Sequence, residues 1–145
     1  MIETKMFLID TNILIYAYDK SDLKKHSIAN AILEKCWKEQ IKLVVSIQNL
    51  VEFFFNITEK IRNPIESDKA KQIILDIIDF PSWIIIRYNE ETIKKAIDIK
   101  INDNTSFWDS LLIATMLENN IFNIYTENEK DFIKVKSINV INPFK

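Results

Sequence analysis

Three acidic residues stand where carboxylates can do chemistry. Asp10 directly follows an apolar segment that we expect to be a buried strand, Asp109 lies in the opening turn of an apolar helix, and Glu52 lies on another helix. Helix starts support negative charge through the helix dipole and free backbone amides. Acids that gather in one place repel one another and have raised pKa values unless a cation neutralises them. The pattern therefore predicts a divalent metal, which can activate water and stabilise displacement at phosphorus.

Each acid also has a purely structural interpretation. Asp10 can cap the helix that follows it, and Asp109 stands three residues after Ser106, at the spacing of a capping box. On the helix of Glu52, polar side chains recur at helical spacing and could simply face water: Gln48, Glu52, Asn56 and Glu59. The metal hypothesis rests on the three acids taken together.

Residues that are rare or absent exclude several other kinds of chemistry. The sequence has no glycine, so phosphate-binding loops and the nucleophile elbow that need a glycine backbone are excluded. One histidine, His26, and one cysteine, Cys36, cannot build a structural zinc site. We expect His26 on the solvated surface and Cys36 in the core. Catalysis must therefore rest on the 21 carboxylates.

Composition and charge indicate one globular domain over residues 1–145. The net charge is −2, so nucleic-acid binding would need local basic patches, such as Lys24 with Lys25 or Lys60 with Arg62. No apolar run approaches the roughly 20 residues that span a bilayer. The N-terminal segment lacks the apolar stretch of a signal peptide, and a lone cysteine suits a reducing compartment. We therefore expect a cytoplasmic location without membrane contact.

Hydrophobic periodicity predicts strands that alternate with helices. We expect strands at 6–9, 43–45, 83–86, 123–125 and 138–141, and helices at 13–18, 24–39, 46–63, 65–79, 90–101 and 105–117. Without glycine, Asn119 and Asn120 are the expected helix stop after the last of these helices. The alternation predicts a three-layer α/β/α fold with a mostly parallel central sheet, in which ligands bind beyond the carboxyl ends of the strands.

Four segments and the C-terminal tail resemble the PIN domains, a family that includes the VapC toxins of toxin–antitoxin pairs. The similarity lies in residues 7–16 (FLIDTNILIY), 46–53 (SIQNLVEF), 106–114 (SFWDSLLIA), 125–128 (YTEN) and 140–144 (VINPF). These segments follow one another in the family's order over nearly the whole chain.

The resemblance implies a set of site residues and a cofactor. Asp10, Glu52 and Asp109 would hold the principal acidic positions and bind Mg²⁺ or Mn²⁺. Residues in a supporting role would be Thr11 and Asn12 in the first metal loop, Ser106 before Asp109, and Thr126 after the fourth strand.

One position departs from the family's pattern. Asn128 stands where relatives often carry a fourth acid, and its neutral amide oxygen supplies no charge. Either a second metal binds more weakly here, or Asp131 or Glu127 takes the place of the missing acid. Of these alternatives we favour the uncharged site.

The same resemblance implies a metal-dependent endoribonuclease, most simply a toxin. Its expected partners are an RNA substrate, an antitoxin that places a helix and a basic side chain over the acidic cleft, and a second copy of the chain. Two alternatives are an RNA-processing or decay nuclease without an antitoxin, and a catalytically inactive PIN fold that binds RNA or assembles with other proteins. A phosphatase of the haloacid-dehalogenase type is set aside, because it needs a second aspartate where this chain has Asn12.

Overall fold

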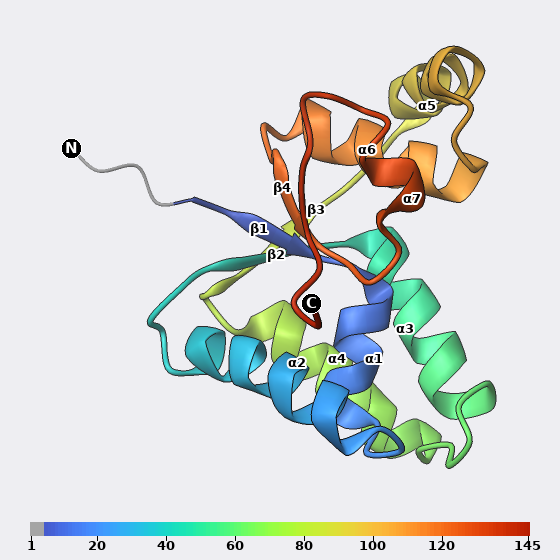
Figure 1. Ribbon diagram of the computed structural model, residues 1–145. Helices are drawn as coiled ribbons and strands as arrows, with labels where there is room; N and C mark the ends of the chain where they lie inside the picture. Colours follow the sequence, from blue (N-terminus) through green and yellow to red (C-terminus); the bar gives the residue numbers. More distant parts are fainter. Residues whose placement is uncertain (1–4) are drawn as a thin grey trace.

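A five-stranded sheet forms the centre of the molecule in the computed structural model, which describes residues 5–145 (Figure 1). Its strands are β1 (Phe7–Ile9), β2 (Leu43–Ser46), β3 (Trp83–Ile86), β4 (Asn123–Tyr125) and β5 (Asn139–Ile141). Their order across the sheet is β3-β2-β1-β4-β5, and every neighbouring pair is parallel. The predicted parallel sheet is confirmed.

Helices cover both faces of this sheet. They are α1 (Thr11–Tyr18), α2 (Leu23–Trp37), α3 (Ile47–Glu59), α4 (Ser67–Asp79), α5 (Glu90–Asp103), α6 (Phe107–Glu118) and α7 (Glu129–Phe132). In Figure 1, α1 to α4 lie below the sheet and α5 to α7 lie above it. The predicted α/β/α layering is therefore confirmed.

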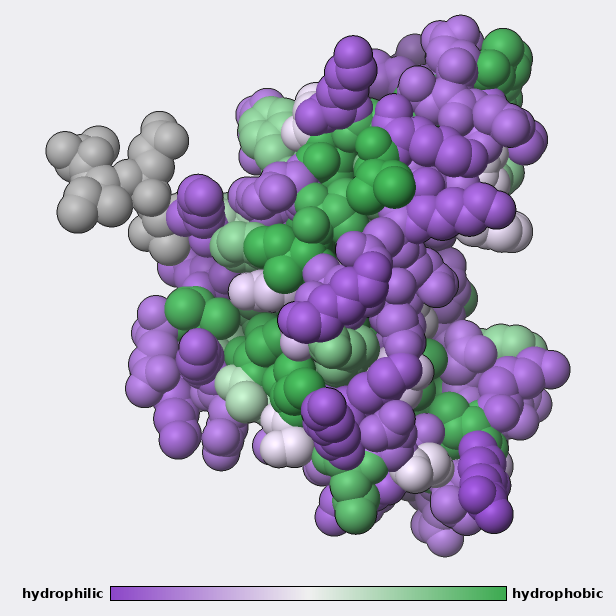
Figure 2. Space-filling view, viewed as in Figure 1, coloured by the Kyte–Doolittle hydropathy of each residue, from purple (hydrophilic) through white to green (hydrophobic). Residues whose placement is uncertain are grey.

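Alternate side chains of each short strand enter different cores. Ile9 packs with α1 to α4 on one face, whereas Leu8 packs with α6 and α7 on the other, and both are fully buried. This follows from the two-residue repeat of a strand. From the side of Figure 1, hydrophilic residues cover most of the surface and apolar residues are visible mainly in the middle (Figure 2).

The order of the strands fixes where a ligand is expected. The chain passes from β1 to β2 and β3 on one side, and then places β4 and β5 on the other side of β1. Connections on the two sides of β1 therefore diverge, and the carboxyl ends of β1 and β4 border the crevice between them. Open parallel sheets bind their ligands at such a reversal.

Several predicted helix boundaries were wrong, and the backbone explains them. The helix capped by Ser46 ends at Glu59 rather than near Asn63, because the following chain folds back and Ile65 donates to the Ile57 carbonyl at 2.9 Å. The helix expected at 24–39 ends at Trp37, because Glu39 adopts a left-handed φ of 59°.

Asparagines end two of the helices, and one short helix has no counterpart in the predicted elements. Asn120 has φ 57°, so the predicted asparagine stop is confirmed, and Asn104 ends α5 in the same way with φ 52°. The one-turn helix α7 was missed, since four residues are too few to show a helical period. It places Asp131 on a helix rather than in an open loop.

The expectation about the chain's start falls partly on residues 1–4, which lie outside the described residues. Among the helices of residues 5–145, none is sufficiently long and apolar to cross a membrane.

Candidate active site

Asp10 lies at the centre of the site, in the connection from β1 to α1. It caps α1 as expected: Oδ1 accepts a 2.8 Å hydrogen bond from the backbone N–H of Thr11. Its Oδ2 accepts a second bond of 2.8 Å from the Thr126 hydroxyl, and the amides of Asn12 and Asn49 lie 3.5 Å from its two oxygens. The side chain is only 8% exposed. Capping thus accounts for the bond from Thr11, whereas Thr126 joins Asp10 to the end of β4 and Asn49 joins it to α3.

Glu52 reaches the same edge of the sheet from α3. Its Oε2 accepts a 3.0 Å bond from the Thr11 hydroxyl, and its Oε1 accepts a 3.0 Å bond from the side chain of Gln48. Asn49 donates to the same Thr11 hydroxyl at 3.0 Å and closes a capping box with Ser46. Thr11 therefore links the environments of Asp10 and Glu52. The alternative of a stripe that faces water is wrong for Gln48, which is buried.

Asp109 occupies the first turn of α6 with its carboxylate left free of the cap. Its backbone N–H donates to the Ser106 hydroxyl at 3.2 Å, as a capping box requires. The reciprocal bond differs from the prediction, because the N–H of Ser106 donates to Oδ2 of Asp131 at 3.0 Å. Lys134 donates to the other oxygen of Asp131 at 3.2 Å. Asp131 thus completes the cap, and its carboxylate also shares a hydrogen bond with the carboxyl group of Asp109.

The connection from β4 to α7 is bound tightly to α1. The hydroxyl of Thr126, which is fully buried, accepts bonds from the Asn12 side chain at 3.3 Å and from the Asn128 backbone at 3.0 Å. The Asn12 carbonyl in turn accepts from the backbone of Glu127 at 3.2 Å. Asn12 and Thr126 therefore lie where the sequence places them, beside Asp10. The Asn128 side chain makes no capping bond to α7.

Glu127 has a positioning role that sequence reasoning missed. Its carboxylate accepts a 2.7 Å bond from the Tyr16 hydroxyl and forms an ion pair with Lys25. The Lys25 ammonium lies 5.1 Å from the centre of the Tyr16 ring and 5.5 Å from that of Phe144. Glu127 is neutralised by these partners and is thereby less suited to replace the missing fourth acid. No sequence signal pairs Lys25 with a residue about 100 positions away.

Burial raises the pKa values of both Asp10 and Asp109. It raises the pKa of Asp10 to about 6 against the opposing hydrogen bonds from Thr126 and Thr11, with a small addition from the charge of Glu52. Burial also raises the pKa of Asp109 to about 7, and the neighbouring Asp131 and the charge of Asp10 add to this rise. For Asp131, burial is outweighed by hydrogen bonds from Ser106, Lys134 and Asp109, so its pKa is lowered. Asp10 and Asp109 are therefore costly to ionise together.

The acids meet at one edge of the sheet without forming a finished metal site. Within residues 5–145, no three acidic, histidine or cysteine side chains are arranged to hold an ion. In the same part of the chain, the ion pairs involve other acids, and none of them includes Asp10, Glu52 or Asp109. Among the described residues, the three carboxylates consequently have no ion-pair partner. Glu52 is held by its hydrogen bonds from Gln48 and Thr11.

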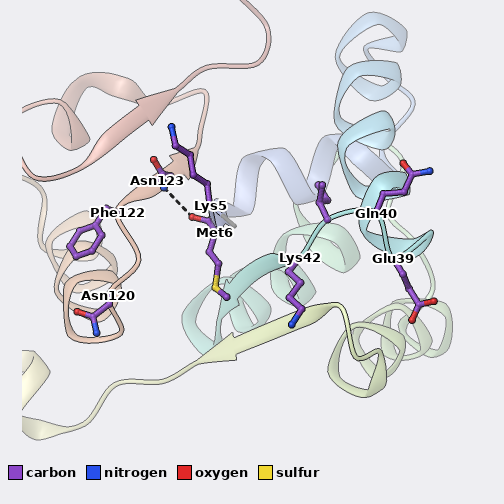
Figure 3. Close-up of a pocket in the computed structure, with 9 residues that line it drawn as sticks. Lys5, Met6, Glu39, Gln40, Lys42, Asn120, Phe122 and Asn123 are labelled. Carbon is purple, nitrogen blue, oxygen red and sulfur yellow. Dashed lines mark hydrogen bonds between the residues drawn. The ribbon is translucent and has the colours of Figure 1, made fainter. Parts of the chain in front are cut away.

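Two pockets at opposite edges of the sheet differ in chemistry. One is lined by Ser106, Asp109, Asn128 and Asp131 among others, and it opens beside the acids. The other lies at the amino ends of β1 and β4, where Lys5, Lys42 and Phe122 line it (Figure 3). This second pocket contains none of the predicted site residues. The acidic edge is therefore the candidate active site.

A comparison with protein families identifies the family of the chain. The model of the PIN domain family matches residues 7–138, which is most of the chain. The chain belongs to the PIN domain family. A comparison with curated proteins found no match.

Solved structures resemble this PIN domain over nearly its whole length. A toxin–antitoxin complex from Klebsiella pneumoniae is 19% identical, with a TM-score of 0.64 and coverage of 94% of this chain and 97% of that one. The Mycobacterium tuberculosis toxin VapC20, which cleaves the sarcin–ricin loop, is 14% identical, with a TM-score of 0.66 and coverage of 88% and 93%. VapBC2 from Rickettsia felis, bound to a promoter DNA fragment, is 17% identical, with a TM-score of 0.65 and coverage of 94% and 98%. At these identities the likeness shows the fold.

His26 and Cys36 lie outside the acidic edge of the PIN domain. His26 is half-buried, and its Nδ1 lies 2.9 Å from the Tyr16 carbonyl oxygen, so the histidine that we expect on the surface is only partly exposed to solvent. Cys36 is fully buried as a free thiol, as predicted.

Proposed function

We propose that this PIN domain is a metal-dependent endoribonuclease with Asp10, Glu52 and Asp109 as its acidic residues. The observation that carries the proposal is their meeting at the carboxyl edge of the sheet without a protein cation in the described chain. Membership of the PIN family supports the same chemistry. Two raised pKa values add a physical reason, since a cation would relieve the cost of ionising Asp10 and Asp109 together.

The donor set suits a hard divalent cation. The carboxylates of Asp10, Glu52 and Asp109, with the amide oxygen of Asn128, are oxygen ligands of the kind that Mg²⁺ and Mn²⁺ accept. Such an ion would supply positive charge at the phosphodiester and lower the pKa of a bound water. The chain's own part is to hold the ligands. Thr126 and the Thr11 amide fix Asp10, and the Ser106–Asp131 contact fixes the turn that carries Asp109.

A cleavage assay tests this function. Purified protein is incubated with single-stranded RNA in Mg²⁺, Mn²⁺ or EDTA, and the Asp10→Ala variant prepared in parallel serves as the comparison. We expect internal cleavage by the wild type with either metal, and none in EDTA or with Asp10→Ala. Equal cleavage by wild type and Asp10→Ala would rule out the proposal.

We propose that the nuclease acts as a toxin controlled by an antitoxin in the cytoplasm. Support comes from one structural neighbour described as a toxin–antitoxin complex and another described as a toxin. A basic antitoxin side chain would neutralise the acidic edge that lacks a cation. Induced expression of the wild type should arrest growth, whereas Asp10→Ala should not. Expression of an RNA-processing nuclease would leave growth unaffected. Expression of an inactive binding module would have the same effect on growth for the wild type and for Asp10→Ala.

A second copy of the chain is the other proposed partner. Three isoleucines of α5 recur every four residues and are exposed: Ile93, Ile97 and Ile101. Residues at this spacing share one helix face, and such an apolar stripe suits a protein interface. The three consecutive phenylalanines of α3, Phe53–Phe55, are a second apolar candidate, but Phe53 belongs to the core and only Phe54 and Phe55 are exposed. Light scattering of the wild type and of Ile97→Asp would test the dimer.

A further inference from the structure

The five residues from Glu127 to Asp131 all line the pocket beside Asp109. Three of them are acids, at positions 127, 129 and 131, and the residues between them are Asn128 and Lys130. Carboxylates alone would repel a phosphate from this pocket. The partners of these acids therefore decide whether the pocket suits a cation or an anion.

Each of the three acids forms an ion pair with a lysine outside the segment. The pairs are Lys25 with Glu127, Lys145 with Glu129 at 2.6 Å, and Lys134 with Asp131 at 3.2 Å. Contacts with Lys145 and Asn142 lower the pKa of the Glu129 carboxyl group, so its partners hold this acid ionised. Lysines outside the segment thus compensate the negative charge of the acids within it.

Lys130 is a further lysine at this pocket, and its side chain is exposed. Among residues 5–145, it takes part in none of the ion pairs. Asp109 is the remaining carboxyl group of the pocket, and it shares a hydrogen bond with Asp131 instead. An exposed lysine is ordinarily a solvated surface charge. This one lies in the pocket next to the proposed catalytic acids, where it offers a positive charge that no acid compensates.

Two neutral side chains of the pocket can donate hydrogen bonds beside Lys130. The Ser106 hydroxyl accepts the Asp109 N–H at 3.2 Å, and this contact leaves its own proton to donate. Asn128 is exposed, and its side chain makes no capping bond to α7. Hydroxyl, amide and ammonium groups are common partners of nucleic-acid phosphates. The pocket thus combines a positive charge with two neutral donors, a set that suits a phosphate group.

We propose that Lys130, with Ser106 and Asn128, binds a backbone phosphate of the RNA in the pocket beside Asp109. The Lys130 ammonium contributes the charge, and its flexible stem lets the contact form without contacts to the base. This inference rests on the proposed nuclease function and adds a substrate-binding residue to the acids of the site. A bound metal ion would neutralise Asp109, so this carboxylate would not oppose the phosphate.

The competing assignment makes Lys130 a counter-ion of Asp109. A counter-ion competes with a metal for the carboxylate, so its removal would tighten Mn²⁺ binding. A phosphate-binding lysine contacts the RNA, so its removal weakens RNA binding and leaves Mn²⁺ binding by the acids close to that of the wild type. Lys130→Gln removes the charge and therefore separates the two roles.

Fluorescence anisotropy of an end-labelled RNA dodecamer measures the phosphate contact. The single-stranded probe is titrated in EDTA, which prevents metal-dependent cleavage, at several salt concentrations. Lys130→Gln should weaken binding about threefold or more and reduce the slope of log affinity against log salt by about 0.7, the value for one phosphate contact on a single strand. Lys130→Arg retains the charge and should bind close to wild type.

Lys136 provides a matched control. It is exposed and lies outside the lining of the pocket, although it follows Lys130 closely in the sequence. Lys136→Gln removes the same charge and should keep the RNA affinity and the salt slope of the wild type. Isothermal titration with Mn²⁺ alone completes the test, and Lys130→Gln should bind Mn²⁺ as the wild type does.

Several results would overturn the inference: no RNA binding by the wild type in EDTA, an unchanged salt slope in Lys130→Gln, an equal loss in Lys136→Gln, or an altered Mn²⁺ affinity in Lys130→Gln. Tighter Mn²⁺ binding in that variant would identify Lys130 as the counter-ion of Asp109. Weaker RNA binding by Lys130→Gln without metal-dependent cleavage by the wild type would support the contact and contradict the nuclease proposal, whereas cleavage with an unchanged salt slope would contradict only the contact.

Discussion

The hydroxyl of Thr126 donates a 2.8 Å hydrogen bond to Oδ2 of Asp10 and joins the ends of β4 and β1 where the sheet reverses its order. The hydroxyl is buried and also accepts bonds from Asn12 and from the backbone of Asn128. Thr126 therefore orients the Asp10 carboxylate. It also anchors the loop that carries Asn128, the residue at which the chain departs from the family's pattern.

Thr126→Val keeps the shape of this side chain and removes its hydrogen bonds. We expect the Mn²⁺ concentration for half-maximal RNA cleavage to rise about tenfold to a hundredfold, the usual effect of losing a partner that orients a metal ligand. Thr126→Ser retains the hydroxyl and should stay close to wild type. An unchanged Mn²⁺ requirement in Thr126→Val would show that Asp10 needs no such support.

Asp10→Asn should change how stability depends on pH. The folded pKa of Asp10 is raised from 3.8 to about 6, so the folded state holds this proton more tightly than the unfolded state. The resulting stability is complete below about pH 4 and is lost as pH rises through about 6. In EDTA, the melting temperature of Asp10→Asn relative to wild type should therefore rise between pH 4 and pH 7.

Two additions make the pH experiment specific. Asp98 is exposed, so the melting temperature of Asp98→Asn should change with pH as that of the wild type does. At pH 7, saturating Mn²⁺ should raise the melting temperature of the wild type more than that of Asp10→Asn, because the variant has lost an anionic ligand. A constant difference between Asp10→Asn and wild type from pH 4 to pH 7 would contradict the raised pKa.

The roles of Asp131 and Asn128 can be separated by paired variants. Asp131 accepts the Ser106 N–H at 3.0 Å, so Asp131→Ala should lower cleavage several-fold through the start of α6, whereas Asp131→Asn keeps an acceptor and should retain most activity. Asn128→Asp should lower the Mn²⁺ requirement by adding the missing charge. If Asp131→Asn loses as much activity as Asp131→Ala, Asp131 acts through its charge and our preference for an uncharged fourth position is wrong.

Lys25 and Glu127 should be energetically coupled. Lys25→Met leaves the half-buried Glu127 carboxylate without its cation, so we expect the melting temperature to fall by about 2–8 °C. Glu127→Gln in the same chain should restore part of the loss, since no unpaired charge remains. Thermal unfolding of the four proteins in the cycle measures the coupling, and strictly additive effects would show that the pair is an unimportant surface contact.

Much of the fold was predictable because its signals are local. The apolar strand before Asp10, the helix start at Ser46 and the asparagine stop at Asn120 each depend on neighbouring residues, and the structure confirms them. The one-turn helix α7 is too short to show a period, and it was missed. Local rules also gave the wrong partner for the Ser106 amide, which bonds to Asp131 from another helix.

The candidate site was predictable in its residues more than in its geometry. Asp10, Glu52 and Asp109 could be named from the positions of acids and from family resemblance. That Thr11 links Asp10 to Glu52, or that Lys25 neutralises Glu127, follows from long-range packing that carries no local pattern. Glu127 is the clearest case, because the sequence allows it as a replacement acid, whereas in the structure Lys25 and Tyr16 bind its carboxylate.

Mn²⁺ binding in the absence of RNA tests the central claim, that the acids at the sheet edge form a cation site. Isothermal titration of Mn²⁺ should detect binding to the wild type and a loss of at least about tenfold in affinity in Asp10→Asn and in Asp109→Asn, since each removes an anionic ligand. Asp98→Asn should bind like the wild type. Equal Mn²⁺ affinity in wild type, Asp10→Asn and Asp109→Asn would contradict the account.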